Sequence, residues 1–97
     1  MIILTEEKVK EIIPAEKIQE VIGVVERGFL DYAQGKIQMP SKEYLYFKEY
    51  QGDLRIMPVY SSTLKIAGTK IVNVHPRNPK RGLPTVMAVM VLNDYSS

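Results

Sequence analysis

Three basic residues in the second half of the chain have the type and setting needed to bind a carboxylate. Lys42 follows Met39-Pro40, while Arg55 and Lys70 each fall in a short run of otherwise largely apolar residues. A cation in an apolar setting is costly unless an anion accompanies it, and a substrate carboxylate is one such anion. Arginine can hold a carboxylate through two parallel hydrogen bonds. The alternative is that these cations face solvent, as most do.

His75 is the only histidine, and the chain contains no cysteine. A metal site is therefore not expected, because the usual nitrogen and sulfur ligands are missing. The imidazole could act as an acid or base, since its pKa lies near neutrality. A structural hydrogen bond to the backbone, where a loop begins, is the other interpretation.

The segment after His75, residues 76–82, is a basic loop with the sequence Pro-Arg-Asn-Pro-Lys-Arg-Gly. Its charges could contact phosphate or nucleic acid. A solvated turn is favoured instead, because no aromatic platform accompanies the charges. The chain also has no Gly-x-Gly-x-x-Gly and no Walker-type loop, so it is not expected to bind a dinucleotide alone by the helix N-terminus route.

The composition predicts one small folded domain, because 45% of the 97 residues are hydrophobic and 25% are charged. The formal net charge of +2 is too small to indicate a nucleic-acid partner. The absence of cysteine excludes disulfides and favours a reducing, cytoplasmic location. The N-terminus resembles neither a signal peptide nor a membrane span, so no membrane association is expected.

The elements that would position the basic residues form an α+β arrangement, with N-terminal helices packed on a mostly antiparallel sheet. Thr5 is a good N-cap for a helix over residues 6–13. A second helix is predicted over residues 14–34, with an apolar face and Gly35 as its C-terminal stop. A short strand or a strand-like anchor is predicted at residues 1–4. Further strands are predicted at 43–50, 54–60, 65–74 and 85–92, with a tight turn at 51–53.

The ordered motifs of the chain resemble the N-terminal part of the ornithine cyclodeaminase and mu-crystallin family, over essentially all 97 residues. They are Met39-Pro40, Arg55-Ile56-Met57-Pro58, Gly68-Thr69-Lys70, Val72-Asn73-Val74-His75-Pro76, Asn78-Pro79, Gly82-Leu83-Pro84-Thr85-Val86 and Leu92-Asn93-Asp94. Each motif is weak by itself, but the ordered set is specific.

The resemblance implies part of a two-domain, NAD(P)-dependent enzyme. Residues 1–97 would form its N-terminal substrate-binding and dimerisation domain, and the Rossmann domain that binds most of the cofactor would be missing from this chain. We therefore expect a homodimer, a small amino or oxo acid substrate, and a chain that alone is inactive. A different class of function stays open, namely an isolated, non-catalytic dimerisation or ligand-binding domain.

The resemblance also assigns roles to four residues. Lys70 matches the lysine that binds the substrate carboxylate near the reacting carbon, which makes it the expected catalytic residue. Lys42 falls where many members have a carboxylate-binding arginine, and Arg55 lies on a strand that carries a further substrate contact. Thr85 matches a threonine that contacts the dinucleotide.

The charge at Arg55 indicates which substrates fit. Bacterial ornithine enzymes of the family carry a glutamate on that strand, placed to meet a substrate amino group. A positive charge there disfavours the second ammonium of ornithine. We therefore expect hydride transfer at the Cα of a small amino, imino or oxo acid, as in the archaeal alanine dehydrogenases and ketimine reductases. Conversion of ornithine to proline and ammonia is the alternative.

Overall fold

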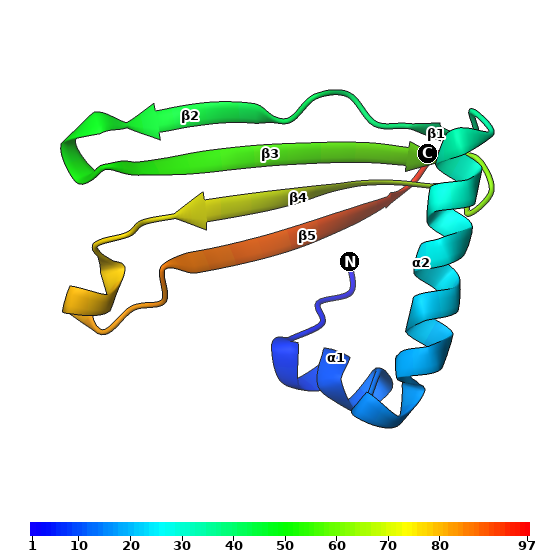
Figure 1. The fold of residues 1–97 in the computed structure, drawn as a ribbon, viewed down its shortest axis with the longest axis horizontal. Coiled ribbons are helices and arrows are strands. Elements are labelled where there is room, and N and C mark those ends of the chain that lie inside the picture. The colour runs from blue at the N-terminus through cyan, green and yellow to red at the C-terminus, as the bar shows by residue number, and fades with distance from the viewer. The chain divides into compact units, whose positions relative to one another are not determined.

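The computed structural model describes residues 1–97 as two compact units, residues 1–34 and residues 35–97. The first unit is helical, and the second is an antiparallel sheet with short 3-10 turns (Figure 1). The predicted α+β class is confirmed, and every strand pair is antiparallel.

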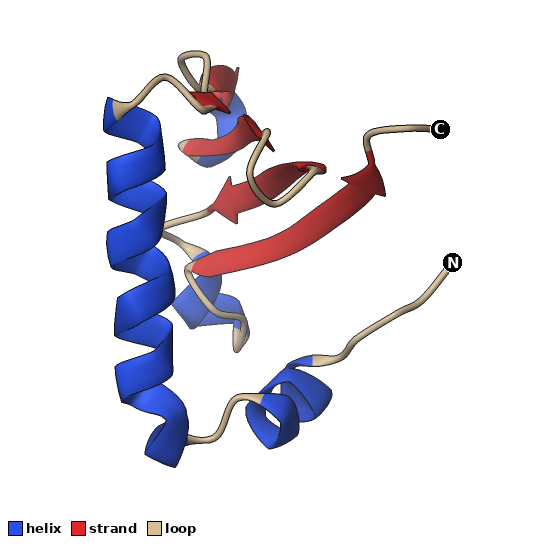
Figure 2. Ribbon diagram, turned by 90° about the vertical axis from the view of Figure 1, so that its right-hand side faces the viewer, coloured by secondary structure: helices blue, strands red, loops and turns tan.

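The helical unit contains α1, Glu6–Ile12, a 3-10 turn at Ala15–Lys17, and α2, Ile18–Ala33 (Figure 2). The second helix was predicted to start at Pro14. Pro14 instead has extended backbone geometry and caps the 3-10 turn, which leads directly into α2. Tight 3-10 turns are frequent at helix N-termini, so the helical path begins close to the predicted place. None of these helices has the length and apolar character needed to cross a membrane.

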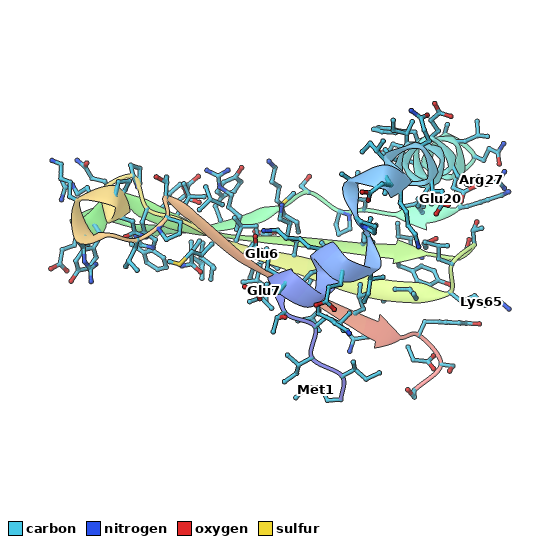
Figure 3. The ribbon with its side chains drawn as sticks, turned by 90° about the horizontal axis from the view of Figure 1, so that it is seen from below. Met1, Glu6, Glu7, Glu20, Arg27 and Lys65 are labelled. Atoms are coloured by element: carbon cyan, nitrogen blue, oxygen red, sulfur yellow. The ribbon has the colours of Figure 1, made fainter.

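Both predicted helix signals, Thr5 before α1 and Gly35 after α2, are present. The Thr5 hydroxyl accepts a hydrogen bond from the backbone N–H of Lys8 at 3.2 Å, so Thr5 is the N-cap of α1. Glu6 and Glu7 lie in the first turn, where the helix dipole favours negative charge (Figure 3). At the end of α2, Gly35 has a φ of +75°, the left-handed geometry that terminates many helices.

The sheet unit has five strands in which β3 is central. They are β1, Ile37–Gln38; β2, Glu43–Phe47; β3, Gly52–Ser61; β4, Ile66–Val74; and β5, Val86–Asp94. The strand order is β1-β3-β4-β5, and β2 also pairs with β3. The three longest strands, β3, β4 and β5, run side by side in Figure 1.

Three details of the strands differ from the prediction. Residues 1–4 form no strand, because no neighbouring segment pairs with them and an apolar run alone does not make a ladder. The strand predicted over 43–50 ends at Phe47 and continues as a 3-10 turn at Lys48–Tyr50. The two-residue strand β1 was not predicted, and the turn predicted over residues 76–82 contains a 3-10 turn at Asn78–Arg81.

The register of the sheet decides which side chains share a face, because cross-strand partners point to the same side. Arg55 pairs with Tyr44 of β2 and Val72 of β4, and Met57 pairs with Lys70. Since side chains alternate along each strand, these five residues lie on one face, here called the cationic face. The opposite face carries mainly apolar residues, Leu45, Phe47, Leu54, Ile56, Ile71 and Val89 among them.

The apolar residues of the sheet are incompletely covered. Val72 is the only buried apolar side chain, and every residue of β5 is exposed. Large apolar side chains such as Val89, Met90 and Leu92 lie in water on this strand. An exposed apolar strand of nine residues at the edge of a sheet is a surface suited to contact with other protein.

Gly52, at the start of β3, is required by the position of the His75 ring. A Cβ atom added at Gly52 would lie 2.4 Å from Nδ1 and 2.7 Å from Cε1 of His75. The ring also stacks on Phe47, with centroids 5.8 Å apart, and this stacking limits its freedom to move. We predict that Gly52→Ala destabilises the fold by about 1–3 kcal/mol, the usual range for overpacking.

Urea denaturation of Gly52→Ala, of His75→Ala and of the double variant measures the change in the free energy of unfolding. His75→Ala removes the ring, so the added cost of Gly52→Ala should largely vanish in the His75→Ala background. An equal cost in both backgrounds would show that the clash with His75 is not its source.

Candidate functional site

Arg55 on the cationic face is paired with a carboxylate of its own strand. Its Nε donates to Oδ1 of Asp53 at 2.7 Å, and Nη2 donates to Oδ2 at 3.3 Å. The two residues are two positions apart on β3, so both point to the same face. The guanidinium has five N–H donors, and these two bonds leave the others for a second anion.

The pairing of Asp53 and Arg55 shifts the pKa of both groups. The hydrogen bond from Arg55 holds the pKa of Asp53 below its ordinary value of 3.8, and the positive charges of Arg55 and His75 act in the same direction. Partial burial opposes this effect. Reciprocally, the hydrogen bond to Asp53 raises the pKa of Arg55. Arg55 therefore stays charged at every physiological pH, with one carboxylate already in place.

Tyr44 connects Arg55 with Lys42. The guanidinium carbon of Arg55 lies 5.3 Å from the centroid of the Tyr44 ring, and Nζ of Lys42 lies 5.9 Å from it. Both distances are within the range of cation–π attraction. The Tyr44 ring in turn stacks on Tyr46 with centroids 5.7 Å apart and an interplanar angle of 6°. The structure thus brings two of the three predicted carboxylate ligands to one aromatic side chain.

Lys70 lies on the same face, diagonally across from Arg55. It pairs with Met57, two residues beyond Arg55 on β3, and with Met90 of β5. Diagonal neighbours in an antiparallel sheet are about 7–8 Å apart, within reach of long side chains. Lys70 is exposed and makes no ion pair with a carboxylate of this chain. Its ammonium is therefore available to an anion on the cationic face.

Thr85 lies away from this group. It immediately precedes β5, and its backbone oxygen accepts a hydrogen bond from the backbone N–H of His75 at 2.8 Å. Thr85 is five residues from Met90, the partner of Lys70. That spacing corresponds to about 17 Å along an extended strand. The structure therefore places the predicted cofactor contact at one end of the sheet, apart from Lys70.

Two residues of the cationic face were missed by the sequence analysis, Asp53 and Tyr44. The signal for Asp53 was its spacing of two from Arg55 on a strand, which puts both on one face. The signal for Tyr44 was the hairpin, whose register pairs it directly with Arg55. The signal for Asp53 was not used because residues 51–53 were predicted as a turn, whereas β3 begins at Gly52. The signal for Tyr44 could not be used before the turn at residues 48–51 fixed the register.

The Asp53–Arg55 pair predicts a pH dependence of stability. A carboxyl whose folded pKa lies below its unfolded value stabilises the fold above the unfolded pKa, and that contribution is lost as pH falls through the folded pKa. We expect NMR titration to give Asp53 a pKa below 3.8. In Arg55→Gln this pKa should rise, because the main hydrogen-bond donor is removed. An unchanged Asp53 pKa in Arg55→Gln would contradict the pairing.

The fold is an antiparallel sheet domain with basic residues gathered on one face, and comparison with known proteins identifies its family. A profile of the Ornithine cyclodeaminase/mu-crystallin family matches residues 2–97. The chain belongs to this family, as its motifs predict.

Two named groups of relatives resemble the chain. The alanine dehydrogenase of Archaeoglobus fulgidus is 50% identical over 92 residues, which cover 95% of this chain and 26% of that protein. Delta(1)-pyrroline-2-carboxylate reductase of Bacillus cereus is 28% identical over 80 residues, 82% of this chain and 25% of that protein.

Solved structures give the same two resemblances. An archaeal alanine dehydrogenase dimer with bound NAD has a TM-score of 0.85 and 48% identity, covering 97% of this chain and 27% of that one. Thermococcus litoralis Delta(1)-pyrroline-2-carboxylate reductase in complex with NADH and L-proline has a TM-score of 0.78 and 35% identity. The match covers 81% of this chain and 24% of that one. The chain thus spans about a quarter of the length of these relatives.

Proposed function

We propose that residues 1–97 are the substrate-binding and dimerisation domain of an NAD(P)-dependent oxidoreductase. The reaction is hydride transfer at the Cα of a small amino acid, with alanine favoured and the corresponding oxo acid as its partner. The observation that carries the proposal is the placement of Arg55 and Lys70 on one face, with Lys42 beside the same tyrosine as Arg55. The 50% identity to an archaeal alanine dehydrogenase supports the choice of alanine.

The basic residues of the cationic face hold the substrate carboxylate in this proposal. Arg55 donates from the N–H groups that Asp53 leaves free, and Lys42 adds a second positive charge beyond Tyr44. Lysine supplies the charge but not the planar two-point contact of arginine, so Lys42 acts mainly through attraction. Asp53 is a positioning residue, since it fixes the plane of the Arg55 guanidinium.

Lys70 is the catalytic residue in this proposal. Its exposed ammonium can donate a hydrogen bond to the carboxylate or to the oxo group at the reacting carbon. Donation to the oxo group polarises the carbonyl, and the same ammonium can deliver a proton to the developing oxygen or nitrogen. Holding the carboxylate at two or three points supplies the orientation that hydride transfer needs.

The residues of this chain fit one contact with a nicotinamide cofactor and no complete site for it. Thr85 offers a hydroxyl just before the start of β5, but no glycine-rich phosphate loop occurs in the sequence. NAD or NADP, when bound, supplies the hydride acceptor or donor. The solved relatives with NAD and NADH support a nicotinamide cofactor here.

A cyclic imino acid is the second candidate substrate. The structural resemblance to a Delta(1)-pyrroline-2-carboxylate reductase at 35% identity favours it. Its carboxylate is attached to the reacting carbon, so the same basic residues would bind it. Ornithine fits less well, because its second ammonium would meet the positive charges of the cationic face.

Assembly as a homodimer is part of the proposal. The exposed apolar strand β5 supports it, because such a surface is stabilised by contact with a second protein surface. The archaeal alanine dehydrogenase structure described as a dimer also supports it. A reducing, cytoplasmic location is proposed from the absence of cysteine.

A spectrophotometric screen of nicotinamide reduction and oxidation tests the proposal. The polypeptide that carries this chain is assayed with alanine, with pyruvate plus ammonia, with ornithine and with a cyclic imino acid. We expect the highest kcat/KM with alanine and pyruvate. Faster turnover of ornithine would overturn the proposed substrate class. If none of these substrates supports nicotinamide reduction or oxidation, the proposed oxidoreductase activity is wrong.

A further inference from the structure

Besides the cationic face, the sheet unit contains a pocket at the end of the sheet where Thr85 lies. The proposed function does not use this pocket. Its volume is about 630 Å³, within the range of small-molecule sites. Tyr50 from the turn between β2 and β3 lines it, together with His75, Arg77 and Arg81 from the connection between β4 and β5. The pocket is thus built by two connections that lie far apart in the sequence.

The charged side chains that line this pocket are all basic. Arg77 and Arg81 line it without an ion pair to any carboxylate of this chain, and no acidic residue is part of its wall. Asp53, whose pKa the charge of His75 helps to lower, is already bonded to Arg55. Two unpaired guanidiniums beside one imidazole form a surface suited to a phosphate, which arginine binds through pairs of parallel hydrogen bonds.

The backbone that carries the two arginines is held in place. Asn78 is buried, and its side-chain amide donates to the backbone oxygen of Pro84 at 2.9 Å, which ties the loop across its base. Its backbone N–H donates to the oxygen of His75 at 3.0 Å, and its oxygen accepts from the N–H of Leu83 at 3.1 Å. Gly82, with a φ of +73°, closes the 3-10 turn. The loop therefore presents Arg77 and Arg81 from a fixed frame.

The remaining wall of the pocket is apolar. The Tyr50 ring, Leu83 and Met87 line it beside the arginines. A flat aromatic body can stack on a tyrosine and contact a methionine sulfur favourably. An inorganic anion would leave this part of the pocket unfilled, so the pocket combines a cationic side with a side for a flat, apolar group.

We propose that this pocket binds a phosphomonoester with a flat aromatic body, of the class of the nucleoside monophosphates. Arg77 and Arg81 hold the phosphate, and Tyr50, Leu83 and Met87 hold the base. Met87 pairs with Asn73, so its side chain lies on the face of the sheet opposite Lys70, which pairs with Met90 in the middle of the β4–β5 ladder. The site is therefore separate from the cationic face. It does not depend on the proposed oxidoreductase activity.

Calorimetric titration of the polypeptide that carries this chain tests the proposal with AMP, adenosine and inorganic phosphate, each in the presence of saturating NAD. We expect AMP to bind at least about tenfold more tightly than either adenosine or phosphate, because only AMP fills both sides of the pocket. Arg77→Gln with Arg81→Gln should weaken AMP at least about tenfold. Lys80→Gln is the matched control, since Lys80 belongs to the same turn but does not line the pocket.

The other outcomes of this titration contradict the proposal. Loss of AMP binding in Lys80→Gln as large as in the double arginine variant would show a general effect of positive charge. Equal affinity for phosphate and AMP, or no binding of AMP, would exclude a nucleotide pocket. Competition between NAD and AMP would place AMP in the cofactor site. Lys70→Ala should leave AMP affinity unchanged, so failure of this proposal and failure of the proposed enzyme are separable.

Discussion

Replacing Lys70 with alanine is expected to lower kcat/KM for alanine by about a thousandfold, the upper range for loss of one preorganised donor in an active site. The ammonium of Lys70 is exposed and unpaired, and in the proposed function it is the group beside the reacting carbon, while Arg55 and Lys42 hold the carboxylate. Lys70→Arg keeps the charge but moves it further from the strand, and it should recover only part of the rate. Steady-state kinetics on the polypeptide that carries the chain measures both variants.

Stability measurements separate this catalytic effect from misfolding. Lys70 is exposed and unpaired, so its removal should change the free energy of unfolding by less than about 0.5 kcal/mol. Lys36→Ala removes another exposed lysine of the sheet unit and should leave the rate unchanged. A Lys70→Ala variant that unfolds normally and retains most of its activity would show that Lys70 is not the catalytic residue.

Reversing the charge at Arg55 is expected to change the substrate preference. In Arg55→Glu, kcat/KM for alanine should fall by about a hundredfold, because a charge-assisted bond to the carboxylate is replaced by repulsion. The second ammonium of ornithine would then meet a carboxylate. The ratio of kcat/KM for alanine to that for ornithine should therefore fall at least about tenfold.

Asp53 requires a matched control in this experiment. Arg55→Glu leaves two carboxylates on one face of β3, and their repulsion raises the pKa of one of them. Asp53→Asn with Arg55→Glu removes that repulsion and should show the same change of preference. Asp53→Asn alone keeps the guanidinium and should raise KM with a smaller effect on kcat, as expected for a positioning residue. A substrate ratio that stays constant in all three variants would exclude Arg55 from the substrate site.

The parts of the fold that depend on local sequence were predictable. Thr5 and Gly35 carry conformational signals that act within one helix turn, and both are found in the predicted roles. The hairpin of β2 and β3 and the long strands β4 and β5 follow from apolar runs separated by turn residues. The family motifs carried part of the same information, since residues 72–76 mark the end of β4 and residues 82–86 the start of β5.

The parts that depend on pairing between distant segments could not be read from the sequence. The apolar run Met1–Leu4 lacks a partner strand, while Ile37–Gln38 becomes a strand because Tyr60 and Ser61 pair with it. The position of Arg55 over Tyr44 depends on the register of β2 against β3. The sequence identified three basic residues as candidate carboxylate ligands. Only the strand register shows that two of them, Arg55 and Lys70, are diagonal neighbours on one face.

A crystal structure of the polypeptide that carries this chain, with pyruvate and oxidised cofactor bound, tests the central claim most directly. The cationic face predicts that the pyruvate carboxylate accepts hydrogen bonds from Arg55 and Lys70 within about 3.2 Å. Arg55 should keep its bond to Asp53 in that structure. A carboxylate bound on the opposite face of the sheet, or bound without contact to either residue, would contradict the account.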